Sequence, residues 1–139
     1  MEPLDCEEYD RWIRQAEYTY RSIEGDMGLQ AYAWACFKAQ QATEFAVKAL
    51  LRALGKPVFG HNLVALFNEL SGLCGGVDER LKFCVGYLDK MYVTPRCPDA
   101  LAEGVPYERY TREETVEAAE CARALIDWVK GCSPCRSTR

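Results

Sequence analysis

The centre of the chain carries a row of polar side chains in an otherwise apolar segment. Residues 36–55 read CFKAQQATEFAVKALLRALG, and the polar positions recur three or four residues apart. At about 100° per residue, such positions project from one helix within an arc of roughly 120°. The row consists of Gln30, Lys38, Gln41, Glu44, Lys48 and Arg52. It fits either a face in contact with water or a site where a lysine and an amide bind a phosphate or a base edge.

The two interpretations differ along the row. Glu44 and Lys48 stand four residues apart, and a solvent-exposed pair at this spacing stabilises a helix by only about 0.2–0.5 kcal/mol. We expect Lys38 and Arg52, at the edges of the row, to be solvated. For Gln41, Glu44 and Lys48 both interpretations stay open.

His61, the only histidine of the chain, follows Gly60 at an expected helix start. A residue at this place most simply hydrogen-bonds to the backbone. Its functional alternative is a phosphate contact or a proton shuttle, because helix N-termini attract anions and imidazole titrates near neutrality.

Arg96 lies between Pro95 and Pro98, where the backbone has little freedom. A rigidly presented guanidinium suits bidentate binding of a phosphate or carboxylate. The alternative is an internal salt bridge that fixes the loop onto the helices, with Asp99, Glu44 or Asp89 as its partner.

The spacing of apolar residues predicts the helices that position these groups. The first helix is capped by Asp5, with Glu8 completing a capping box, and ends near Gly25. The second spans about residues 29–54 and is apolar over so wide an arc that several neighbours must cover it. A short third helix starts at residue 61 or 62, a fourth follows a cap at residue 78 and ends at about residues 92–95, and a fifth spans about residues 111–131, with a capping box at residues 111 and 114.

Because the connections are mostly short, we expect an all-α, antiparallel up-and-down bundle of four main helices plus one short helix. Residues 1–131 form the bundle, and residues 132–139 form a flexible tail. The chain has 139 residues, 27% of them charged, and a net charge of −4, so nonspecific nucleic-acid binding has no global electrostatic basis. The N-terminus lacks a signal-like apolar region and no apolar run approaches the roughly 18 residues of a membrane span, so we expect a cytoplasmic protein without membrane association.

Eight cysteines are many for such a chain. Those within helical patterns, Cys36, Cys84 and Cys121, are expected to be free thiols in the core. The others lie at element ends or in loops, where oxidation is sterically possible, as in disulfide-bearing proteins of thermophiles: Cys6, Cys74, Cys97, Cys132 and Cys135. The isolated C-x-x-C at residues 132–135, in a chain with one histidine, favours neither a zinc site nor a redox site.

Short motifs along the chain resemble the HEPN domain (higher eukaryotes and prokaryotes nucleotide-binding domain), in its small stand-alone prokaryotic form. They are Trp12 with Ala16, AQQATEFAVKALL at 39–51, His61-Asn62-Leu63, and Arg96-Cys97-Pro98-Asp99-Ala100. The resemblance extends from about residue 9 to 130. It implies a helical bundle, often dimeric and frequently paired with a small nucleotidyltransferase in two-component modules of toxin–antitoxin type. It places Gln41, Glu44, Lys48, His61, Arg96 and Asp99 in a nucleotide- or anion-binding site.

Many HEPN proteins are metal-independent ribonucleases with an Arg-x4–6-His motif, and this chain departs from it. The positions that would supply the arginine are Leu54, Gly55 and Lys56, and Arg52 is separated from His61 by residues 53–60. RNA cleavage without metal requires a general base, a general acid and a cation on the phosphate. One imidazole serves only one of the proton-transfer roles in each chain, or two across a dimer. The departure from the motif therefore favours binding without catalytic residues.

We therefore expect a non-catalytic homodimer without cofactor or metal, which binds a nucleotide or RNA-like anion or docks a nucleotidyltransferase. We expect a homodimer because the chain has more large apolar residues, Trp34 and Trp128 among them, than five short helices need for their core. Exposed apolar patches generally mark interfaces. A metal-independent ribonuclease toxin and a purely structural interaction subunit are the alternatives.

Overall fold

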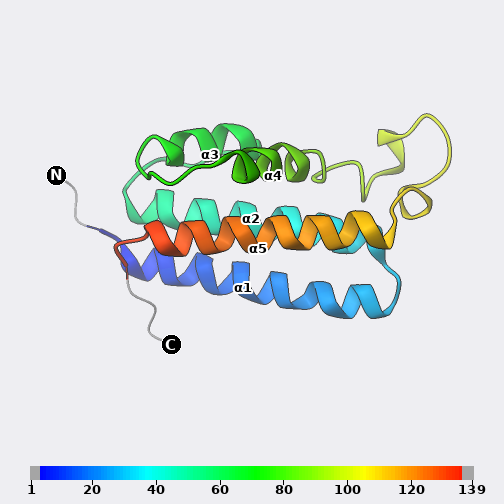
Figure 1. Cartoon of the computed structure of the whole chain (residues 1–139), viewed down its shortest axis with the longest axis horizontal. Helices are drawn as coiled ribbons and strands as arrows, with labels where there is room; N and C mark the ends of the chain where they lie inside the picture. Colours follow the sequence, from blue (N-terminus) through cyan, green and yellow to red (C-terminus); the bar gives the residue numbers. More distant parts are fainter. Residues whose placement is uncertain (1–3, 136–139) are drawn as a thin grey trace.

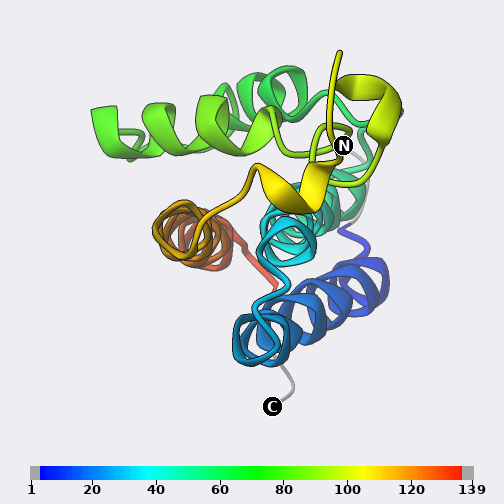
Figure 2. The same cartoon turned by 90° about the vertical axis from the view of Figure 1, so that its right-hand side faces the viewer.

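Helix α2 (Tyr32–Ala53) is the central element of the fold. In the computed structural model, which describes residues 4–135, it contacts α1 (Cys6–Gly28), α3 (Leu63–Ser71), α4 (Glu79–Asp89) and α5 (Arg112–Cys132). Figure 1 shows α1, α2 and α5 as three long neighbouring rods. Figure 2 views these rods nearly end-on, with α3 and α4 lying across one side of them. The wide apolar arc of α2 is buried because neighbours surround it.

Contacts between helices fix their directions. Glu8 near the start of α1 pairs with Arg52 near the end of α2, and Asp26 near the end of α1 pairs with Lys38 near the start of α2. The two helices are therefore antiparallel. The described residues contain no β-strand. The predicted all-α antiparallel bundle of four main helices and one short helix is confirmed.

Side-chain caps begin the helices at most of the predicted places. Thr111 and Glu114 form the reciprocal capping box predicted for α5, and Asp78 accepts from the backbone at the start of α4. Asp5 caps α1 by accepting from the Glu8 N–H at 3.1 Å. The Glu8 side chain does not complete that box, because its carboxylate is bound by side chains of α1 and α2.

The junction of α1 and α2 differs from the prediction. Helix α1 continues to Gly28, past the predicted end near Gly25, and α2 begins at Tyr32 instead of Leu29. Gln30 has a φ of 57°, in the left-handed region, and this residue separates the two helices. The spacing of apolar side chains does not predict one residue with a left-handed backbone.

Six of the eight cysteines lie in disulfide bonds. The pairs are Cys6–Cys135, Cys74–Cys132 and Cys84–Cys121, with Cα–Cα distances of 5.6, 6.0 and 5.0 Å. The prediction that Cys84 and Cys121 are free core thiols is wrong, because the buried faces of α4 and α5 bring their backbones within bonding range. Cys36 is a buried free thiol, as predicted, and Cys97 is also free.

The chain end after α5 is held to the bundle over its first residues. The sequence predicts a flexible tail over residues 132–139, but Cys132 ends α5 and both Cys132 and Cys135 are disulfide-bonded. Residues 136–139 of the predicted tail lie outside the described residues. Between residues 4 and 135, none of the helices has both the length and the apolar character that crossing a bilayer requires.

Candidate anion-binding site

Glu44 projects from the middle of α2 into the protein and is 1% exposed. Its Oε2 accepts a hydrogen bond from Lys48 Nζ at 3.0 Å and lies 2.9 Å from His61 Nδ1. Its Oε1 accepts from Gln40 Nε2 at 3.0 Å and, more weakly, from Gln41 Nε2 at 3.5 Å. Both carboxylate oxygens are therefore bonded, as burial of a charged group requires. We refer to these five residues as the Glu44 cluster.

Burial of the Glu44 cluster overturns the solvated-face interpretation for two members of the polar row. The side chains of Glu44 and Lys48 are 1% and 10% exposed, because His61, just before α3, lies over this side of α2. Gln41 is half-buried, and its Nε2 donates to Gln40 Oε1 at 2.7 Å. The Lys48 ammonium thus bonds to a carboxylate and does not project toward solvent.

The two edge residues of the row contact α1. Arg52 Nη1 lies 3.3 Å from Glu8 Oε1, and its guanidinium carbon lies 4.5 Å from the ring centroid of Trp12. Lys38 Nζ lies 2.8 Å from Asp26 Oδ2, an ion pair without good hydrogen-bond geometry. Both side chains are only about one-third exposed, so the prediction of a simply solvated edge is wrong.

His61 is held by the Glu44 cluster and not by the backbone. Asn62 is the N-cap of α3, and its side chain accepts from Ala65 N at 3.0 Å. The expected backbone bond of His61 is thus replaced by its contact with Glu44. Because an ionised carboxylate only accepts, Nδ1 carries the hydrogen, and Nε2 remains to accept, or to donate when the ring is protonated. The imidazole is 47% exposed.

Tyr92 links His61 to Arg96. The Tyr92 and His61 rings stack with centroids 4.2 Å apart and an interplanar angle of 16°. The guanidinium carbon of Arg96 lies 4.5 Å from the Tyr92 centroid and 5.2 Å from that of Phe37, and Arg96 Nε donates to the Tyr92 carbonyl at 2.6 Å. The exposed guanidinium and the imidazole thus both lie against the Tyr92 ring.

The internal salt bridge considered for Arg96 is absent from residues 4–135. Glu44 is bound within its own cluster, Asp89 accepts from the Leu63 N–H at 3.0 Å, and Asp99 is exposed on the short helix η1 (Pro98–Ala100). Aromatic faces and a carbonyl hold Arg96 instead. Among the six candidates, Arg96 and Asp99 have no hydrogen bond or ion pair to another candidate, and Arg96 is linked to His61 only through the Tyr92 ring.

Sequence reasoning missed residues that complete this arrangement. Gln40 is fully buried and bonds to Glu44, although it directly precedes the predicted Gln41. The sequence extends the fourth helix to about residues 92–95, but α4 ends at Asp89 and Tyr92 lies half-buried in the following turn. Its position three residues before Pro95 is the one signal that a turn begins early.

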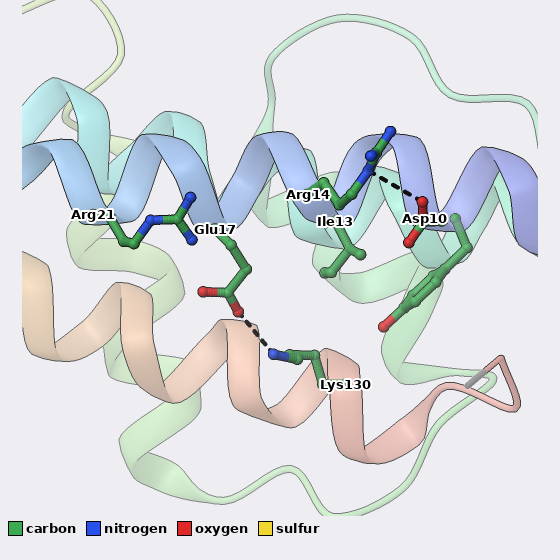
Figure 3. A pocket seen from close by; sticks show the side chains of 7 residues that line it. Asp10, Ile13, Arg14, Glu17, Arg21 and Lys130 are labelled. Atoms are coloured by element: carbon green, nitrogen blue, oxygen red, sulfur yellow. Dashed lines mark hydrogen bonds and ion pairs between the residues drawn. The ribbon is translucent and has the colours of Figure 1, made fainter. Parts of the chain in front are cut away.

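The hollow between α1 and α5 is a separate feature with internally paired charges. Figure 3 shows Glu17 pointing toward Lys130, whose Nζ lies 2.9 Å from its Oε1. Arg123 donates two further hydrogen bonds to Glu17, at 3.0 and 3.1 Å, and together these cations lower the pKa of Glu17 to about 2. Asp10 and Arg14, also in this hollow, pair at 3.1 Å. We interpret the group as an ion network that joins the two helices.

Comparison with known proteins identifies the fold family. The family model described as "HEPN domain" matches residues 9–132. The chain belongs to the HEPN domain family. A search of the curated proteins finds no match.

Solved HEPN-like structures superpose over most of the chain. TT1696 from Thermus thermophilus is 38% identical with a TM-score of 0.83, covering 88% of this chain and 96% of its own. ST0689, an archaeal HEPN homologue, is 34% identical with a TM-score of 0.70, covering 94% and 98%. The HEPN domain protein tm0613 from Thermotoga maritima is 29% identical with a TM-score of 0.69, covering 87% and 95%.

The position of Arg52 bears on the HEPN ribonuclease motif. A cation next to the imidazole would be needed to bind the phosphate that is being cleaved. Arg52 instead contacts Glu8 and Trp12 of α1, whereas His61 bonds to Glu44. In this HEPN domain the arginine that shares a contact residue with His61 is Arg96, through Tyr92.

Proposed function

We propose that this HEPN domain binds a phosphate-bearing nucleotide or RNA-like anion, without catalysing its cleavage, at the surface formed by His61, Tyr92 and Arg96. The observation that supports this most is the fixed, half-exposed imidazole, bonded through Nδ1 to a buried carboxylate. The Arg96 guanidinium can donate to phosphate oxygens, and the His61 Nε2 can do so when the ring is protonated. The Tyr92 ring keeps both in place.

Within this proposal, the other predicted residues act by positioning. Lys48 balances the charge of Glu44 at 3.0 Å, so an approaching anion does not meet an uncompensated carboxylate. Gln40 and Gln41 bond to the second carboxylate oxygen and fix its orientation. In this proposal Gln41, Glu44 and Lys48 orient His61 and do not bind the anion directly. In this proposal Asp99 is not a phosphate ligand, because its carboxylate repels an anion.

Calorimetric titration with AMP and with inorganic pyrophosphate tests the proposal. Arg96→Ala and His61→Ala should each weaken binding by about 10- to 150-fold, because hydrogen bonds to charged groups contribute about 1.5–3 kcal/mol. Arg21→Ala is the matched control, since Arg21 is an exposed arginine of α1 far along the sequence from this site. Wild-type protein that binds neither compound at millimolar concentration would refute the proposal.

The proposal extends to partners. We place the protein as the companion subunit of a small nucleotidyltransferase in a two-component, toxin–antitoxin-like module, and as a homodimer. The family resemblance and the large exposed apolar side chains, including Leu29, Phe59 and Tyr107 at 80%, 83% and 74% exposure, support an interface. Light scattering should give twice the 15.8 kDa chain mass, and a neighbouring nucleotidyltransferase should co-elute on co-expression. A monomeric mass at micromolar concentration would refute the homodimer.

A metal-independent ribonuclease is the second candidate, and the Glu44–His61 contact is the observation that favours it. A carboxylate that orients an imidazole is a common support of a general base. Incubating labelled single-stranded RNA with wild-type protein in EDTA separates the two functions. Intact RNA supports binding alone, whereas cleavage that is lost in His61→Ala supports the nuclease.

A further inference from the structure

A row of aromatic rings continues from the proposed anion site toward the start of α2. The Phe37 ring lies 6.1 Å from Tyr92, and the Trp34 ring lies 6.2 Å from Phe37, both measured between centroids. With the stacked His61, the row contains four rings in successive contact. Arg96 lies over the two middle rings, Phe37 and Tyr92. One cation is therefore centred on an aromatic surface.

Trp34 ends this row and is 51% exposed. It contacts Phe37 with 75° between the ring planes, so the two rings are not stacked face to face. The other tryptophan of the α1–α2 pair differs, because Trp12 has Arg52 over its ring and donates its N–H to Glu8. Trp34 has neither kind of contact among residues 4–135. Within the described part of the chain, Phe37 is therefore its aromatic partner, and about half of Trp34 remains open to solvent.

We propose that the natural ligand of this site is a single-stranded oligonucleotide, with one base stacked on Trp34 and a neighbouring phosphate on Arg96 and His61. This inference rests on the function proposed above and names the class of ligand. Every base has a π-face, and aromatic platforms beside a cation bind single strands with little sequence preference. The bases of a duplex are stacked on one another and are not free to lie on such a ring.

The arrangement of charge favours a nucleic acid over a peptide. The aromatic row has an exposed guanidinium at its middle and an imidazole at its end, and the one carboxylate in contact with these groups, Glu44, is paired with Lys48. An oligonucleotide supplies planar rings and negative charges, which complement the rings and cations of this row. A protein partner would have to supply an acidic, aromatic segment to match the same features.

Titration of a fluorescein-labelled octamer of uridylate, beside AMP, tests the inference separately from the proposed function. Trp34→Ala should weaken octamer binding by roughly five- to 150-fold, as loss of one stacked base does, and Trp34→Phe should restore most of it. Binding of inorganic pyrophosphate, titrated in parallel because it has no base, should change less than twofold in Trp34→Ala. Tyr18→Ala is the control, because Tyr18 is an aromatic residue of α1 with 61% exposure. Circular dichroism verifies that each variant is folded.

The outcomes distinguish the oligonucleotide inference from the proposed anion site. If Trp34→Ala binds the octamer as tightly as wild type while Arg96→Ala loses both ligands, the oligonucleotide inference is overturned and the anion site stands. If wild type binds the octamer no more tightly than AMP, the inference is also overturned. If Trp34→Ala leaves octamer affinity intact but abolishes the dimer or co-elution with a partner, the row is a protein interface and not a nucleic-acid platform.

Discussion

Replacing Glu44 by alanine distinguishes a buried charge cluster from a solvated helical pair, because the two predict very different losses in the free energy of unfolding. The substitution leaves the Lys48 ammonium, whose side chain is 10% exposed, without the carboxylate now 3.0 Å away. Breaking a buried ion pair in this way destabilises a protein by about 3–5 kcal/mol. A solvated i,i+4 pair contributes only about 0.3–0.5 kcal/mol. We therefore expect Glu44→Ala to lower the free energy of unfolding by about 3–5 kcal/mol.

Urea unfolding followed by circular dichroism measures this difference. With an m-value of about 2 kcal/mol/M, a loss of about 4 kcal/mol moves the midpoint by about 2 M. Asp10→Ala is the matched control, because Asp10 and Arg14 form an i,i+4 pair whose side chains are 32% and 51% exposed. The double variant Glu44→Leu/Lys48→Met removes both charges and should recover part of the lost stability, because the buried Gln40 Nε2 still loses its acceptor. A Glu44→Ala effect below about 1 kcal/mol, equal to that of Asp10→Ala, would refute the reasoning.

The disulfides and the buried groups give three further predictions. Removing the Cys6–Cys135 bond by serine substitutions should cost about 5 kcal/mol of unfolding free energy, because it closes a loop with a sequence separation of 129; an unchanged urea midpoint would exclude the bond. The pKa of Glu17 is lowered from 4.5 to about 2, so the stability that its ion pairs contribute is complete above pH 4.5 and is lost as the pH falls toward 2. In a plot of the urea midpoint against pH, Glu17→Gln should therefore flatten the fall on the acid side. An unchanged slope there would contradict the ion network. Burial raises the pKa of Cys36 to about 11, so iodoacetamide at pH 8 should label Cys97 alone in the folded, non-reduced protein, and a second adduct in the mass spectrum would show that Cys36 is accessible.

The helices could be predicted because their signals are local. Apolar spacing and caps located α2, α4 and α5 to within a few residues, and the Thr111–Glu114 capping box formed as predicted. The break at Gln30 was missed, because its left-handed backbone depends on how α1 and α2 pack together.

The candidate site was only partly predictable from sequence. Helical periodicity gives the direction in which Glu44 and Lys48 project, and it put them on the same arc as Lys38 and Arg52. It does not show that the chain before α3 returns across one side of that arc and buries Glu44 under His61. The same limit applies to cysteines, because the meeting of Cys84 with Cys121 depends on the register between α4 and α5. Tertiary packing decides both.

The most direct test of the account uses the single histidine of the chain, whose imidazole resonance needs no assignment by mutagenesis. The Cε1–H signal is followed by NMR while inorganic pyrophosphate is added at constant pH. The account predicts a saturable shift of this signal, and an Arg96→Ala variant that needs at least tenfold more pyrophosphate for the same shift. A signal that does not move at millimolar pyrophosphate, or that moves identically in Arg96→Ala, would contradict an anion site at His61 and Arg96.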